Sequence, residues 1–337
     1  MTVAVPPPAG PVQKGVSAPT FSVLITAYQE ADYVADAVAS ALSQTTPPHE
    51  VVVCDDGSTD DIEGALAPYR DDIVLLRQEN RGVASARNAA AAAASGDFLA
   101  ILDADDIYMP DRLAALGRLA AERPDLEVLT TDAYLEVNGQ VVRRAYTPSW
   151  TFPVNDQRSE ILRRNFVFGL AAVRREVLLG AGGWDESFRF AEDWECWVRL
   201  LLNGSRVGCV VEPLARYRVR ENSLSTNHVA MLEGEIKALG KALTHPRIRP
   251  EEDLVARGTI ARLEQELAVD RLREALRTRA LGARRCAAAI ATDRAAPLQT
   301  RLKAAAAAVA PGAVGFLLNR RDRREWRGAG GTTVRRA

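Results

Sequence analysis

Short apolar runs alternate with helix-forming segments four times within about 100 residues, and this order constrains the fold more than any other feature. A run that is apolar at nearly every position is typical of a strand buried on both faces of a parallel sheet. The intervening segments place apolar residues at helical spacing, as in Val34, Val38 and Ala41. We therefore predict an α/β fold with a mostly parallel sheet flanked by helices. The predicted strands are residues 21–27, 50–54, 73–76 and 98–102.

The rest of the chain predicts a hairpin and a helical extension. Asn138-Gly139 is a strong tight-turn signal and predicts a β-hairpin over residues 135–142. Residues 189–203 have a helical pattern, and from about residue 229 the chain is helical and rich in Ala, Leu, Arg and Glu. The predicted division is a flexible tail over residues 1–19, an α/β domain over residues 20–228 and a helical basic region over residues 229–337.

Charge is divided unevenly between the two parts of the chain. The net charge is -1, from 43 basic and 44 acidic residues. Residues 1–240 hold 22 basic and 34 acidic side chains, whereas residues 241–337 hold 21 and 10. An acidic α/β domain argues against nucleic acid as a partner. The basic C-terminal part is compatible with an anionic partner.

Composition and processing signals predict a cytoplasmic protein. The four cysteines form no CxxC pair, which favours a reducing compartment. The N-terminal segment has neither the charged start nor the apolar core of a signal peptide. No stretch of the sequence reaches the roughly 18–20 apolar residues of a membrane span. Three scattered histidines without an HExxH pattern argue against a zinc hydrolase.

Acidic residues follow the fourth predicted strand directly. In parallel sheets, ligands bind beyond the carboxyl ends of the strands, and Asp103-Ala104-Asp105 lies at such an end. Two carboxylates one residue apart can face one divalent cation, and Mn²⁺ and Mg²⁺ prefer oxygen ligands shared with substrate phosphates. We predict a metal site at Asp103 and Asp105, with Mn²⁺ or Mg²⁺ as cofactor. Asp106 or Asp111 is expected to cap the next helix.

A second acidic cluster, Asp55-Asp56, follows the second strand. Two adjacent carboxylates after a buried strand repel each other, which costs stability unless a ligand or a cation uses them. Asp56 is a candidate acceptor for a hydrogen bond from a nucleobase. For Asp60, the expected role is the cap of the following helix.

A third acidic cluster, Glu192-Asp193, begins the helix predicted after Trp184. The helix dipole favours ionised carboxylates at this position, so Glu192 serves either charge complementarity or ligand binding. Tryptophans are core or wall residues, and a carboxylate beside a tryptophan wall can be a general base next to a sugar. The sequence contains no GxxxxGK[ST] loop, no GxGxxG after the first strand and no GxSxG elbow. These absences argue against a P-loop nucleotidase, a dinucleotide oxidoreductase and an α/β hydrolase.

Taken together, the motifs resemble those of the inverting, GT-A type glycosyltransferases of family 2. The likeness covers about residues 20–225, and five motifs in the family's order make it highly specific. Their positions are residues 23–30, 51–60, 80–88, 96–106 and 183–194.

The resemblance implies transfer of a sugar from a nucleotide-diphosphate donor with inversion at the anomeric carbon. It places the general base at Asp193 and the metal ligands at Asp103 and Asp105. It implies that Thr26, Tyr28, Glu30 and Asp56 line the nucleoside pocket, and it puts Arg87 near the nucleobase or the diphosphate. With the candidates above, the predicted substrate-binding residues are Thr26, Tyr28, Glu30, Asp56, Arg87, Asp103, Trp184, Glu192 and Arg218.

The sequence lacks the QxxRW signature and the membrane spans of processive synthases, so one sugar per acceptor is expected. The expected partners are a UDP-sugar donor and a glycan or lipid-linked acceptor, in cell-envelope polysaccharide or glycolipid synthesis. Arg218 either contacts phosphate or forms a surface ion pair with Glu221. The alternative function is a non-catalytic nucleotide-sugar-binding or scaffold protein with the same fold.

The C-terminal part has its own alternatives. Residues 251–281 predict an amphipathic helix that packs on the α/β domain or on a second copy in a homodimer. Residues 316–327 combine apolar side chains, clustered arginines and a tryptophan, which suits peripheral contact with an anionic membrane at its inner face. The alternative is a solvated helix end followed by a flexible tail.

Overall fold

The computed structural model describes residues 2–6, 18–220, 227–278, 282–293, 296–311 and 314. The predicted flexible tail over residues 1–19 is wrong at Val3–Ala4, which form strand β1 beside β10. Residues 7–17 of that tail lie outside the described residues, and so do Glu221 and residues 316–327. The membrane-contact hypothesis therefore stays a prediction.

The described residues form one mostly parallel ten-stranded sheet, which confirms the predicted α/β fold. The order of its main path is β1-β10-β7-β9-β5-β2-β3-β4, with β6 beside β10 and β8 beside β7. The path β5-β2-β3-β4 is parallel, and an antiparallel β9 lies between β5 and β7. The strands are β1 (Val3–Ala4), β2 (Phe21–Ala27), β3 (Glu50–Asp55), β4 (Val74–Arg77), β5 (Phe98–Asp103), β6 (Ile107–Tyr108), β7 (Val128–Val137), β8 (Gln140–Arg144), β9 (Ala172–Arg174) and β10 (Val207–Val219).

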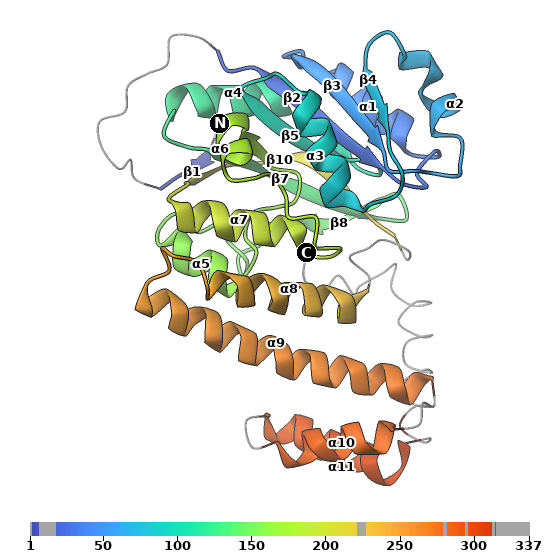
Figure 1. Ribbon diagram of the computed structural model, residues 1–337, viewed down its shortest axis with the longest axis vertical. Coiled ribbons are helices and arrows are strands. Elements are labelled where there is room, and N and C mark those ends of the chain that lie inside the picture. Colours follow the sequence, from blue (N-terminus) through green and yellow to red (C-terminus); the bar gives the residue numbers. More distant parts are fainter. Residues whose placement is uncertain are drawn as a thin grey trace.

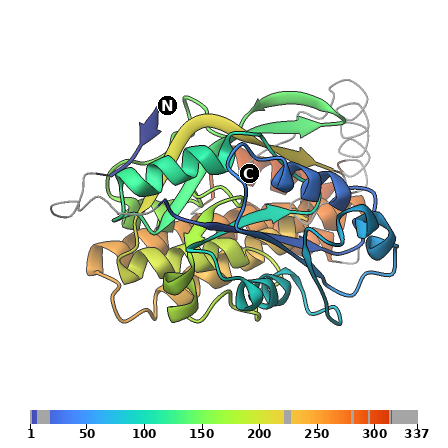
Figure 2. The ribbon, with the colours of Figure 1, turned by 90° about the horizontal axis from the view of Figure 1, so that it is seen from above.

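Helices cover both faces of the sheet, as Figures 1 and 2 show. Alternate residues of each central strand point to opposite faces. Val23 and Ile25 of β2 belong to the core cluster shared with α1 and α4, whereas Leu24 belongs to the cluster shared with α3 and α7. The helices are α1 (Val34–Leu42), α2 (Ile62–Leu66), α3 (Val83–Ala93), α4 (Arg112–Glu122), α5 (Gln157–Arg163), α6 (Arg175–Gly180), α7 (Glu192–Asn203), α8 (His228–Ala242), α9 (Pro250–Arg277), α10 (Ala283–Thr292) and α11 (Leu298–Val309), with a 3-10 turn at Ala67–Tyr69.

The predicted hairpin is present between β7 and β8. Asn138 and Gly139 form its tip with φ of 50° and 77°, the left-handed conformation that these two residue types tolerate best. The four predicted strands are β2 to β5, with ends that differ by at most one residue from the sequence prediction.

The C-terminal helices extend away from the sheet in successive layers (Figure 1). Leu232 and Leu239 of α8 and Leu263 of α9 belong to the same core cluster as α7, so packing is continuous across residue 228. The helix predicted over residues 251–281 is α9, and it packs on α8 and α5 of its own chain. Helices α10 and α11 pack on each other and on the end of α9, around a separate small apolar cluster.

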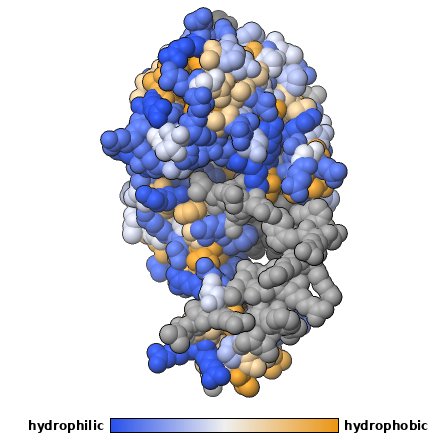
Figure 3. All heavy atoms as spheres, turned by 90° about the vertical axis from the view of Figure 1, so that its right-hand side faces the viewer, coloured by the Kyte–Doolittle hydropathy of each residue, from blue (hydrophilic) through white to orange (hydrophobic). Residues whose placement is uncertain are grey.

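Apolar side chains reach the surface at the α10–α11 end of the molecule (Figure 3). Leu298, Leu302 and Val309 of α11 are the large apolar residues exposed there. Within the described ranges, no helix combines the length and the apolar character needed to cross a membrane.

Candidate active site

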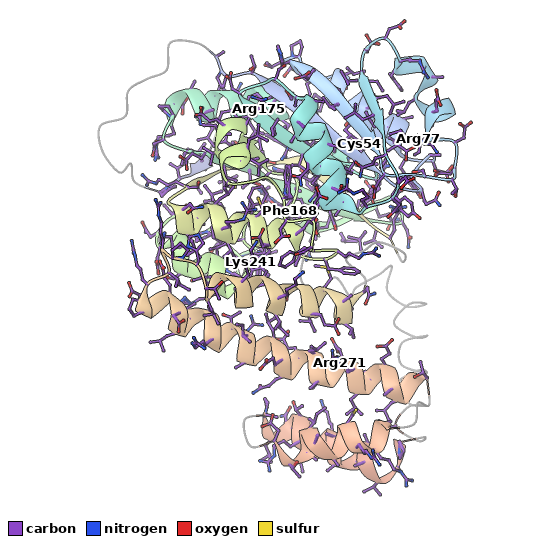
Figure 4. All side chains as sticks on the ribbon, in the orientation of Figure 1. Cys54, Arg77, Phe168, Arg175, Lys241 and Arg271 are labelled. Carbon is purple, nitrogen blue, oxygen red and sulfur yellow. The ribbon has the colours of Figure 1, made fainter. Side chains whose placement is uncertain are left out.

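The sheet register brings the acidic motifs to one edge. Thr26 pairs with Asp103 across β2 and β5, and Ala27 pairs with Asp55 across β2 and β3. Asp55 in turn pairs with Arg77 of β4, which is labelled in Figure 4. The carboxyl ends of four adjacent strands therefore meet, as the positional argument predicted.

Asp56 organises the loop beside this edge. Its carboxylate accepts hydrogen bonds from Gln78 Nε2 at 2.7 Å, Arg81 N at 3.0 Å and Gly82 N at 2.8 Å. Asp55 Oδ1 accepts from Ser58 N at 2.8 Å. The expectation that a ligand must relieve the repulsion between the two carboxylates is therefore wrong, because the protein's own donors stabilise both. A carboxylate has about four acceptor positions, so these three hydrogen bonds leave one position on Asp56.

Two residues of the first motif shape the predicted nucleoside pocket. Tyr28 is 48% exposed at the end of β2, where its ring is open to a ligand. Gln29 has φ of 59°, and its side chain accepts hydrogen bonds from Thr59 N and Asp60 N. A left-handed non-glycine backbone costs about 1–3 kcal/mol and is typical of functional sites. Gln29 thus ties the end of β2 to the loop after β3.

The expected helix caps are partly wrong. The cap of α2 is Asp61, whose side chain accepts from Gly64 N, whereas Asp60 accepts from Ala31 N. Asp111 precedes α4 but makes no side-chain cap and instead accepts from Thr45 Oγ1. Asp106 is fully buried and accepts from Arg218 N, so it connects β10 to the turn at Asp103-Ala104-Asp105, the DxD motif, instead of capping a helix.

The two DxD carboxylates each meet an arginine. Asp103 Oδ1 lies 2.8 Å from Arg87 Nη2, and Asp105 Oδ2 lies 2.6 Å from Arg220 Nη2. Arg220 also pairs with Glu30. Burial raises the pKa of Asp105 and of Glu30, and the neighbouring carboxylates add to both shifts. This edge of the sheet therefore holds a cluster of carboxylates whose negative charge Arg87 and Arg220 offset.

The residues present fit a divalent cation. The arginine contacts of the DxD use Oδ1 of Asp103 and Oδ2 of Asp105, which leaves one oxygen of each carboxylate for metal coordination. The part of the chain that the structure describes has no group of three or more His, Cys, Asp or Glu side chains that could hold a metal ion. Two carboxylates alone are typical of Mg²⁺-type sites, where substrate phosphate and water complete the shell.

Arg87 joins the DxD to the third acidic cluster. Its buried guanidinium donates to Asp103 on β5 and, at 2.8 Å, to Glu192 Oε1 at the start of α7. Burial raises the pKa of Glu192 to about 7, with Asp193 and Asp103 contributing in the same direction and Arg87 opposing them. Glu192 therefore does more than complement the dipole of α7, because its carboxylate forms an ion pair with Arg87.

Asp193 lies beside Glu192 in the first turn of α7. Its Oδ2 accepts from Asn165 Nδ2 at 3.0 Å, and its Oδ1 accepts from Trp194 N. Burial raises the pKa of Asp193, whereas Arg87 lowers it. Ala191 precedes this pair with φ of 58°, another strained backbone at the site. A carboxylate with a raised pKa is a better general base near neutral pH than an ordinary aspartate.

Trp184 does not form the sugar-facing wall that the sequence suggested. It is 1% exposed, and its ring belongs to the core cluster shared with α3 and α7. Its main chain exchanges two hydrogen bonds with the Asn88 side chain. Trp184 therefore holds α3 against the segment before α7, and this places Arg87 opposite Glu192.

Arg218 contacts carboxylates of the protein itself. It pairs with Asp36 at 3.1 Å and lies 3.8 Å from Glu136. Arg220 and Asn165, the partners of Asp105 and Asp193, are not among the residues predicted from the sequence. Arg220 lies two residues after Arg218, a spacing that puts both side chains on the same face of a strand. This pattern could have indicated Arg220 as a site residue. Asn165 carries no local signal, because only the tertiary fold brings it to α7.

A pH-dependent stability is expected from Glu192. Its folded pKa exceeds the unfolded value of 4.5, so the folded state binds more protons between pH 4.5 and about 7. The stabilisation is therefore complete below pH 4.5 and is lost as pH rises through about 7, at no more than about 1.4 kcal/mol per pH unit. Urea unfolding of the wild type and of Glu192→Gln across this range should show this slope in their difference. A difference independent of pH would contradict it.

The fold and the acidic edge define a GT-A type nucleotide-sugar-transferase architecture. The structure of S. aureus TarS 1-349 in complex with UDP superimposes with a TM-score of 0.60 at 19% identity, over 91% of both chains. The mannosyltransferase PcManGT from Pyrobaculum calidifontis, in complex with GDP-Man and Mn²⁺, superimposes with a TM-score of 0.58 at 21% identity, over 92% of this chain and 81% of that chain. These likenesses confirm the predicted fold.

Sequence comparison then gives the family. Residues 22–180 match glycosyl transferase family 2, and through them the chain belongs to that family. It is 35% identical over 230 residues to the succinoglycan biosynthesis protein ExoU of Rhizobium meliloti, and 33% identical over 222 residues to ExoO of the same organism. The matches cover 63% and 61% of this chain and 66% and 63% of those relatives.

Proposed function

We propose that this protein is a non-processive glycosyltransferase that moves a sugar from a nucleotide diphosphate to an acceptor hydroxyl, with inversion. The observation that carries the proposal is the connection between the two acidic motifs. Arg87 links the DxD residue Asp103 to Glu192, directly beside Asp193. Candidate diphosphate ligands and a candidate base therefore belong to one network at the carboxyl edge of the sheet.

The donor side of the proposal rests on the carboxyl ends of β2, β3 and β5. Thr26, Tyr28 and Asp56 surround the space beyond β2 and β3, where a nucleoside can stack on the exposed Tyr28 ring. Asp103 and Asp105 would hold Mn²⁺ or Mg²⁺ on the diphosphate. The cation would act as a Lewis acid that stabilises the departing nucleoside diphosphate.

The acceptor side rests on Asp193. In-line attack requires removal of the proton from the acceptor hydroxyl, and Asp193 Oδ2 would take it. Asn165 donates to this oxygen and fixes the side chain. A single displacement opposite the leaving group inverts the anomeric carbon, through a transition state of oxocarbenium character.

The proposed pathway is synthesis of a cell-envelope polysaccharide or glycolipid, because the matched relatives are named for succinoglycan biosynthesis. A UDP-sugar is the proposed donor. TarS was crystallised with UDP, and PcManGT with GDP-Man, so both bases belong in the test.

Donor screening tests the proposal directly. We expect UDP- or GDP-sugars to raise the melting temperature in the presence of Mn²⁺, and the same donor to be hydrolysed or transferred. A ligand at 100 times its Kd stabilises the folded state by about 2.7 kcal/mol, and the resulting rise in melting temperature is easy to measure. Asp103→Asn with Asp105→Asn should remove the Mn²⁺-dependent part of the shift.

Other outcomes separate the alternatives. Binding of a nucleotide sugar without any turnover, with Asp193→Asn indistinguishable from the wild type, would favour the scaffold function. A chain that binds no nucleotide sugar under any metal condition would contradict both functions.

A further inference from the structure

We propose that Arg220 is an internal counter-cation that competes with the divalent cation for Asp105, so that the cation and the nucleotide diphosphate bind cooperatively. This inference rests on the proposed function, because it concerns the same donor site. It goes beyond that function by assigning a role to an arginine outside the recognised motifs.

The geometry of Arg220 is that of a clamp on two carboxylates. Its Nε and Nη2 donate to Asp105 Oδ2 at 3.1 and 2.6 Å, and Nη2 also donates to Glu30 Oε1. The guanidinium lies 4.6 Å from the centroid of the Tyr33 ring, which fixes its plane. Arg220 immediately follows β10, so the last strand of the sheet delivers this charge to the DxD.

The surrounding charges explain why a cation is needed there. Asp103, Asp105 and Glu30 are close enough for their charges to interact, and Asp105 and Glu30 are only 18% exposed at the side chain. Arg87 offsets Asp103, whereas Arg220 offsets Asp105 and Glu30. Without such partners, the repulsion among these carboxylates would not be offset.

A divalent cation at the DxD would use the same carboxylate that Arg220 holds. Two positive groups on one carboxylate repel each other strongly in a partly buried site. The cation must therefore displace the guanidinium from Asp105 or bind against its repulsion, and either case weakens binding of the cation alone.

The nucleotide diphosphate reverses this balance. A guanidinium displaced from Asp105 finds a new partner in the phosphates, because its planar fork matches phosphate oxygens. The cation favours release of Arg220, and the diphosphate favours the released position. By linkage, each ligand then strengthens binding of the other by the same factor.

Arg220→Gln tests the competition. We expect Mn²⁺ alone to bind more tightly to this variant than to the wild type in isothermal titration calorimetry. UDP should raise the Mn²⁺ affinity of the wild type by a factor within the roughly 5- to 150-fold range of coupled sites, and this factor should be smaller in the variant, where only the direct contact between the cation and the diphosphate couples the two ligands. Arg220→Lys, which keeps the charge without the fork, should be intermediate.

The matched control is Arg216→Gln. It removes the same charge from β10, at a side chain that is 48% exposed and lies 3.7 Å from Glu136, without contact to Asp105. Both affinities should equal those of the wild type. Circular dichroism verifies the fold of each variant.

The outcomes distinguish this inference from the proposed function. Unchanged Mn²⁺ affinity in both Arg220 variants, or no Mn²⁺ binding with or without UDP, would overturn the inference. If Mn²⁺ and UDP bind cooperatively through Arg220 but no sugar is transferred by the wild type, only the proposed function fails.

Discussion

Asp193→Asn is expected to lower kcat for sugar transfer by about 10²- to 10⁴-fold, the range typical of a lost general base. The asparagine keeps the size of the side chain and can still contact Asn165, so the site should retain its shape. Affinity for the nucleotide-sugar donor should stay unchanged, because the predicted donor contacts lie at the strand ends. Transfer kinetics and donor calorimetry on the same preparation measure the two effects separately.

The control for Asp193 is Asp125→Asn. Asp125 pairs with Arg123 and Arg206 on another part of the surface, so it removes a carboxylate without touching the site. It should leave kcat unchanged. Equal turnover of Asp193→Asn and the wild type would remove Asp193 from the role of the base.

Arg87→Met should destabilise the folded protein by about 3–5 kcal/mol, the cost of removing one partner from a buried ion pair. The side chain of Arg87 is 5% exposed and stands between Asp103 and Glu192. Methionine fills much of the volume but leaves Glu192 buried without a counter-charge. Urea unfolding at pH 7.5 measures the loss, and Glu192→Gln in the same background should recover part of it.

The pH dependence of this loss of stability separates the effect of the Arg87 charge from the effect of its side-chain volume. The loss should shrink at pH 5, because protonated carboxylates no longer need the guanidinium. A loss of equal size at both pH values would show that packing alone is involved. The matched control is Arg81→Ala, whose 63% exposed side chain pairs with Glu186 on the surface and should cost no more than about 1 kcal/mol.

Local patterns predicted β2 to β5 and the hairpin between β7 and β8, but not β1, β6, β9 or β10. The apolar runs of β2, β3 and β5 became buried strands because a strand buried on both faces needs an apolar side chain at almost every position, whereas β4 is a partly exposed edge strand. The Asn138-Gly139 turn appeared because few other residue pairs tolerate two left-handed conformations in sequence. The acidic clusters could be placed at one edge because neighbouring parallel strands end at the same side.

Partners of the charged residues could not be predicted in the same way. Asp60 looked like a cap from its position, but the cap is Asp61, and a shift of one residue is beyond what a local pattern resolves. Trp184 looked like a wall residue, and only the packing of α3 against α7 shows that its ring is in the core.

The sequence by itself therefore determined the α/β fold, the sheet edge at which the acidic motifs meet and the family. It did so because strand burial, strand direction and motif order are properties of short segments. Only the tertiary structure decided that Arg87 joins Asp103 to Glu192 and that Arg220 holds Asp105. These contacts join residues up to 115 positions apart, and such a contact forms only when folding brings both segments to one edge of the sheet.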